Sequence, residues 1–141
     1  MAFYNRTKLE LQATQEKLQA AESRIDELEA DFRAIEQHTA LMVLSRDGLV
    51  ERVSKPCLEL FGYQQEEKLI GKHHRVFCED DYARGEEYIV FWRELVTGHV
   101  KEGQFFNLDA QGEGIWLNAS YLPVLSDKGI VKRIVVLYRP G

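Results

Sequence analysis

A seven-residue spacing of side chains runs through the N-terminal part of the chain. One series is Tyr4, Leu11, Leu18, Ile25 and Phe32, and a second follows three residues behind it, with Thr7, Thr14, Ala21, Leu28 and Ile35. These are the a and d positions of a heptad repeat. Residues 1–38 also contain no Gly and no Pro. The pattern therefore predicts one long helix with a narrow apolar seam.

The charges beside the seam favour two parallel helices in register. Lys17 would face Glu22 across such a pair, and Arg24 would face Glu29, whereas Asp31 and Glu36 would repel. We therefore expect a parallel homodimer. Its interface residues would be Leu11, Leu18, Ile25, Leu28, Phe32 and Ile35. The alternative is a single amphipathic helix folded back on its own domain.

The composition changes near residue 38, because all ten glycines and all three prolines lie beyond it. We expect a dimerising helix over 1–38 and a separate domain over 39–141. Short alternating runs predict strands at 40–45, 49–53, 103–108, 115–125 and 130–138, with helices at 56–61, 64–70 and 82–96 between them. Strands gathered at both ends and helices in the middle indicate an α+β fold, a five-stranded antiparallel sheet with helices on one face.

Charge and hydropathy narrow the range of partners. The formal net charge is −5, with 18 basic and 23 acidic residues interspersed, so the chain offers no basic stripe for nucleic acid. No apolar run is long enough for a membrane segment, and no secretory signal precedes the helix. Cys57 and Cys78 have no metal-ligand spacing. Two thiols of this kind are typical of a cytoplasmic protein.

Several motifs after residue 40 resemble those of PAS domains. General marks of that family are the Asp47-Gly48 turn and Phe61-Gly62-Tyr63. A more specific set is similar to PAS domains of bacterial chemotaxis transducers and aerotaxis-type receptors. It comprises Gly71-Lys72-His73-His74-Arg75-Val76-Phe77, Tyr88-Ile89-Val90-Phe91-Trp92, Leu95-Val96-Thr97-Gly98, Gly103-Gln104-Phe105 and Trp116-Leu117-Asn118-Ala119-Ser120-Tyr121-Leu122-Pro123.

The resemblance implies a sensory pocket between the sheet and the helices. In that family the pocket holds FAD, heme, a small metabolite or nothing, and the signal passes through flanking helices to an output domain, which would lie outside this chain. Ser54 stands where the family usually has an Asn that helps to hold a flavin. The cofactor is thus left open between heme, FAD and none.

Five residues are candidates for holding a cofactor: His73, His74, Trp92, Trp116 and Asn118. The two histidines lie where heme-binding relatives carry an axial ligand, and His74 is the candidate for the heme iron. The Trp rings could stack on a flavin, and the Asn118 amide could bond a ligand. The alternative for each is ordinary core packing or a structural hydrogen bond.

No catalytic motif is present, since the sequence lacks a nucleophile elbow, a phosphate-binding glycine loop and a zinc-binding His pair. We therefore expect a binding module and not an enzyme. Two functions remain open. One is a cytoplasmic sensor that relays a ligand, gas or redox signal through a dimeric helix. The other is a ligand-free dimerisation and assembly module of a larger signalling protein.

Overall fold

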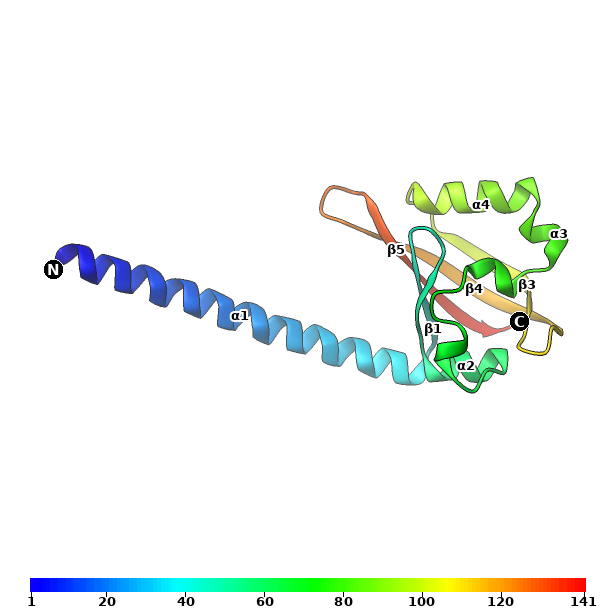
Figure 1. The fold of residues 1–141 in the computed structure, drawn as a ribbon, viewed down its shortest axis with the longest axis horizontal. Helices are drawn as coiled ribbons and strands as arrows, with labels where there is room; N and C mark the ends of the chain where they lie inside the picture. Colours follow the sequence, from blue (N-terminus) through cyan, green and yellow to red (C-terminus); the bar gives the residue numbers. More distant parts are fainter. The chain divides into compact units, whose positions relative to one another are not determined.

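The computed structural model describes residues 1–141, and its backbone contacts divide the chain into two units, Met1–Ile35 and Glu36–Gly141. The long helix α1 begins at Ala2 and ends at His38 (Figure 1). It makes up nearly all of the first unit, and its last residues, 36–38, belong to the second unit. The predicted helix is confirmed, and its uninterrupted length follows from the lack of Gly and Pro.

No residue of α1 is buried. The leucines and isoleucines of its seam, Leu11, Leu18, Ile25, Leu28 and Ile35, are 50–59% exposed. Near the N-terminus the seam is polar. There Thr7 and Thr14 each donate a hydrogen bond from the hydroxyl to the carbonyl four residues earlier, at 3.0 Å.

The second unit is built on one five-stranded antiparallel sheet in the order β2-β1-β5-β4-β3. Its strands are β1 (Ala40–Ser45), β2 (Val50–Val53), β3 (Lys101–Leu108), β4 (Gly114–Leu125) and β5 (Val131–Pro140). The last strand therefore lies in the middle of the sheet, between the first strand and β4. The predicted α+β fold is confirmed.

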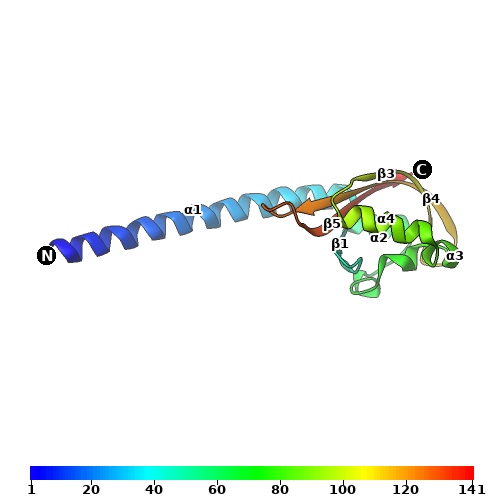
Figure 2. The same ribbon diagram turned by 90° about the horizontal axis from the view of Figure 1, so that it is seen from above.

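The helical segments between β2 and β3 lie on one face of this sheet (Figure 2). They are α2 (Lys55–Phe61), η1 (Glu66–Lys68), η2 (His74–Phe77), α3 (Asp80–Ala83) and α4 (Glu86–Val96), where η denotes a 3-10 helix. Two expectations are corrected here. The helix predicted over 64–70 is a short 3-10 turn, and the helix predicted over 82–96 is divided at Gly85.

Gly85 explains the division. Its backbone is extended, with φ −82° and ψ 162°, and it is the N-cap residue just before α4. A Cβ at this position would lie 3.3 Å from the carbonyl oxygens of Asp81 and Tyr82. The chain thus turns tightly between α3 and α4, and the amphipathic pattern continues across a break that the pattern itself does not reveal.

The core lies between the inner face of the sheet and these helices. Alternate residues of β4, among them Leu117, Ala119 and Tyr121, point inward and are buried. They pack with buried rings from the helical layer, such as Phe61 and Phe77. Each fully buried apolar side chain of this size contributes about 1.5–3 kcal/mol to folding.

None of the helices combines the length and the apolarity needed to cross a lipid bilayer.

Candidate functional site

A buried histidine lies at the centre of the helical layer. His74 begins η2 and is 2% exposed. Its Nδ1 lies 2.8 Å from the hydroxyl of Tyr88 on α4, and its Nε2 lies 2.9 Å from the hydroxyl of Tyr121 on β4. One imidazole therefore links a helix to the inner face of the sheet.

The His74 ring is neutral. Burial lowers its pKa to about 3, and the neighbouring His73 acts in the same direction. A neutral imidazole carries one N–H donor and one bare nitrogen acceptor. One tyrosine hydroxyl therefore accepts a hydrogen bond from the ring and the other donates one to it. Burial also raises the pKa of both Tyr88 and Tyr121, so both phenols keep their protons.

A further side chain near this network is buried with one polar atom unpartnered. Asn107 on β3 is 2% exposed; its amide nitrogen donates to the carbonyl of Phe77 at 3.1 Å, but its Oδ1 accepts no hydrogen bond. A buried polar atom without a partner is costly, so Oδ1 of Asn107 is a site for a donor from water or a ligand.

A cavity of about 320 Å³ adjoins this cluster. Its polar lining includes His74, Cys78, Asn107 and Tyr121, and its apolar lining includes Phe91 and Phe105. That volume is at the lower end for a small-molecule pocket. Polar groups converging on a mostly aromatic chamber could hold a small ligand with one or two hydrogen-bonding groups.

The five residues predicted for a cofactor do not gather in one place. His74 and Trp92 lie in the helical layer, with His73 beside them at 5.9 Å from the Trp92 ring. His73 accepts the Arg75 backbone N–H at its Nδ1. Trp116 and Asn118 alternate with the buried residues of β4 and so point to the outer face of the sheet.

The two outer-face residues have partners of their own. Trp116 is 58% exposed and packs against Phe106 on β3, at the rim of the cavity. The amide of Asn118 donates to the carbonyl of Pro140 at 3.3 Å. Neither residue is part of the buried network around His74.

The donor set around His74 does not fit heme. Both ring nitrogens already bond tyrosine hydroxyls, so neither is free for iron. A large planar group would also need the space between sheet and helices that Phe91, Phe105 and Tyr121 fill with ring contacts of 5.0–5.7 Å. The same packing leaves no room for an isoalloxazine ring between the sheet and the helices.

Asn107 is the residue that the sequence analysis missed. It follows Phe105 by two positions on a strand, and alternation therefore predicts that both side chains share the inner face. A polar residue at an inward position between apolar neighbours was the available signal.

Comparison with known proteins agrees with this architecture. Residues 38–139 match the family described as PAS domain. The chain therefore belongs to the PAS domain family, a class of sensory domains in signalling proteins, as its motifs predicted.

One relative and two solved structures illustrate the similarity. The chain is 33% identical over 109 residues to the biofilm dispersion protein BdlA of Pseudomonas aeruginosa, a match that covers 77% of this chain and 26% of that protein. The PAS domain of an HTR-like protein from Haloarcula marismortui has a TM-score of 0.67 at 16% identity, covering 87% of this chain and 99% of that one. The LOV protein of Rhodobacter sphaeroides has a TM-score of 0.68 at 16% identity, covering 81% and 67%.

Proposed function

We propose that this PAS domain is a cytoplasmic sensor that dimerises through α1 and responds to a small ligand in the cavity beside His74. The observation that carries the proposal is the uncovered apolar seam of α1. Its five leucines and isoleucines are half exposed or more, although the helix is otherwise strongly polar. An isolated helix with such a stripe gains stability only from a partner.

A second copy of the same chain fits this seam best. The a and d spacing matches the knobs-into-holes geometry of a coiled coil, and Lys17 and Arg24 would each face an acidic residue of a parallel twin. Each exposed ion pair adds only about 0.3–0.5 kcal/mol, so the apolar seam supplies most of the affinity and the charges select the parallel register.

Sedimentation equilibrium of the full chain tests the dimer. Leu18→Asp introduces a charge into the seam. It is expected to raise the dimer dissociation constant at least tenfold, because two carboxylates would meet in an apolar contact. Leu9→Asp is the matched control, since Leu9 is 65% exposed but lies off the seam. Equal dissociation constants for the two variants would refute a dimer built on this seam.

Ligand binding is supported by the chemistry of the cavity. Oδ1 of Asn107 is a buried acceptor without a donor, and Asn107 lines the chamber together with the rings of Phe91 and Phe105. A compact molecule with one hydrogen-bond donor would satisfy Asn107. Its arrival would change the packing between α4 and the sheet, which His74 links.

The N-terminal end of the sheet offers a route for the signal. Only Thr39 separates α1 from β1, and the last turn of α1 is held by an ion pair between Glu36 and Arg52 on β2. A change in strand position would therefore reach the end of the helix directly. Within a dimer, such a change would shift the population of helix registers.

Native mass spectrometry and an absorbance spectrum of the purified full chain test ligand binding. A retained small ligand that is lost in Asn107→Leu, with the thermal melting temperature kept, would support the sensor. If no ligand is retained, and none of a metabolite panel raises the melting temperature, the cavity is not a sensory site.

The hydrogen bonds on both ring nitrogens of His74 favour the alternative function, a ligand-free assembly module. Because both ring nitrogens are satisfied within the protein, the helical layer can be stable without a ligand. The domain would then serve assembly alone.

In neither function do we propose catalysis, since burial raises the pKa of Cys57 and of Cys78 to about 12 and leaves both thiols protonated and unreactive.

A further inference from the structure

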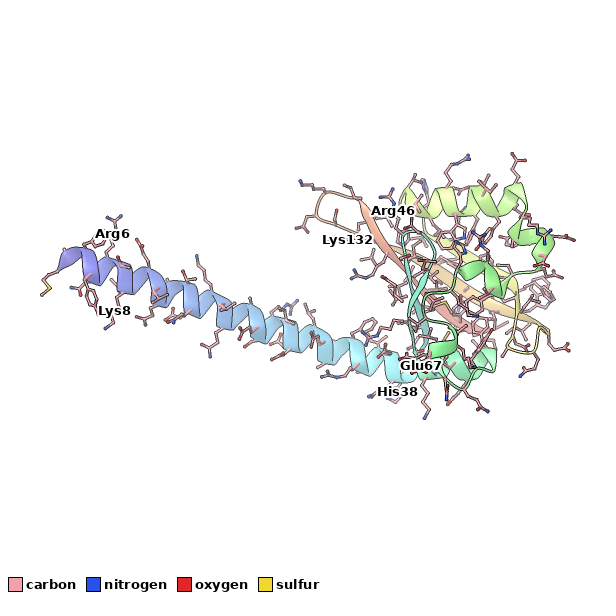
Figure 3. All side chains as sticks on the ribbon, viewed as in Figure 1. Arg6, Lys8, His38, Arg46, Glu67 and Lys132 are labelled. Atoms are coloured by element: carbon pink, nitrogen blue, oxygen red, sulfur yellow. The ribbon has the colours of Figure 1, made fainter.

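Three arginines from separate elements line one groove on the surface of the PAS domain. Arg46 lies at the turn between β1 and β2, Arg75 in η2 and Arg93 in α4, and the groove that they share has a volume of about 460 Å³. Figure 3 labels Arg46 at the tip of the hairpin, at the same end of the domain as α4. We call this feature the arginine groove.

None of these arginines is paired with a carboxylate. Elsewhere on the chain Arg6, Arg24, Arg52, Arg84 and Lys101 all form ion pairs with Glu or Asp. The arginine groove contains one acidic residue, Asp47, against its three guanidinium groups. An excess of positive charge is therefore held in one place on a protein whose net charge is −5.

The floor of the groove is apolar. Ile89, Trp92 and Val96 lie along one side of α4 and line the groove together with Arg93. Ile89, in the first half of α4, is 55% exposed, so its side chain is accessible from the groove. A ligand for this groove should therefore carry negative charge on one part and a flat or apolar body on another.

We propose that the arginine groove binds an organic phosphate, with the phosphate groups on Arg46, Arg75 and Arg93 and the organic part on Ile89 and Trp92. Guanidinium groups bind phosphate oxygens through two parallel hydrogen bonds, and three of them match a multiply charged phosphate better than a single carboxylate. The volume suits a ligand of drug-like size. The site is separate from the cavity beside His74, because the two share no lining residue.

Titration with ATP and with inorganic pyrophosphate, used as probes, tests the proposal. The Trp116→Phe background leaves Trp92 as the only indole, so its fluorescence reports on the groove, and calorimetry gives the affinities. ATP is expected to bind more tightly than pyrophosphate, because ATP carries both a third phosphate for the arginines and a ring for the apolar floor. The absence of binding at millimolar concentrations, or equal affinities for the two probes, would overturn the proposal.

Three variants locate the site. Arg75→Gln and Arg93→Gln should each weaken the binding of both probes by about tenfold, the effect of losing one charge-assisted hydrogen-bond pair. Ile89→Ser should weaken ATP binding and leave pyrophosphate binding unchanged. Arg133→Gln is the matched control, because Arg133 is exposed and forms no ion pair but lies outside the groove. If this control weakens binding as much as Arg75→Gln, the attraction is only general surface charge and the site is refuted.

Discussion

The hydroxyl of Ser54 donates a hydrogen bond of 2.7 Å to the carbonyl of Thr39, the one residue between α1 and β1. The same oxygen accepts the backbone N–H of Leu41 at 2.9 Å and that of Cys57 at 3.2 Å, where it caps the N-terminus of α2. One buried side chain thus joins the end of α1, the first strand and the first short helix. Where relatives usually carry an Asn for a flavin, this chain uses a serine for a structural junction.

Ser54→Ala should lower the free energy of unfolding by about 2–4 kcal/mol. The substitution removes a helix cap, which contributes about 1 kcal/mol, and it leaves the buried N–H of Leu41 without an acceptor, which costs a further 1–3 kcal/mol. Urea denaturation measures the change. Ser126→Ala is the control, because Ser126 also accepts two backbone N–H groups, from Lys128 and Ile130, but in an exposed turn. A loss of the same size in both variants would contradict the role of Ser54 as a buried junction.

Gly48→Ala should destabilise the domain through His73. Gly48 has φ +87°, and a Cβ there would lie 2.7 Å from Nε2 of His73. We expect a loss of about 1–3 kcal/mol, from backbone strain together with the collision. Gly129→Ala is the matched control, since its φ is +78° but nothing lies within 4 Å of the new Cβ. In the His73→Ala background, Gly48→Ala should cost only as much as this control; an undiminished cost would mean that the collision contributes nothing.

The buried His74 should make the domain less stable in mild acid. Its pKa is lowered to about 3 in the folded state, so between pH 6.5 and that value the unfolded chain binds a proton that the folded chain excludes. The contribution of the neutral His74 to the free energy of unfolding is complete above about pH 6.5 and falls as the pH decreases. The contribution lost between pH 7 and pH 5 is about 2 kcal/mol.

Chemical denaturation at the two pH values isolates this effect. His74→Gln should be less stable than the wild type at pH 7 but should lose about 2 kcal/mol less on acidification. His99→Gln, which changes an exposed histidine, is the control variant. If His74→Gln has the wild-type slope, the pKa of His74 is not lowered in the folded domain.

Thr14→Leu should strengthen the proposed dimer. Thr14 occupies a d position of the seam, and its hydroxyl donates a hydrogen bond to the carbonyl of Glu10 in its own helix. A leucine would add buried apolar area in both copies, so the dimer dissociation constant should fall by about tenfold or more in sedimentation equilibrium. Gln12→Leu adds the same side chain at a b position and should leave the dissociation constant unchanged. Equal tightening in both variants would indicate nonspecific association.

Local patterns in the sequence were sufficient to predict the main elements. The heptads and the absence of Gly and Pro predicted α1, because helix propensity and seam periodicity depend only on neighbouring residues. Alternation on the strands and the Asp47-Gly48 turn predicted the hairpin and the long strand β4 for the same reason. The order of these elements then indicated the α+β fold.

Only the tertiary structure decided the chemistry of the site. His73 and His74 are neighbours in sequence, yet one lies against Gly48 near the surface and the other is enclosed and neutral. The difference arises because Tyr88 and Tyr121, 14 and 47 residues away from His74, close around a single ring. The burial of a side chain and its hydrogen-bond partners depend on which distant segments come into contact. The spacing of residues within one segment does not predict those contacts.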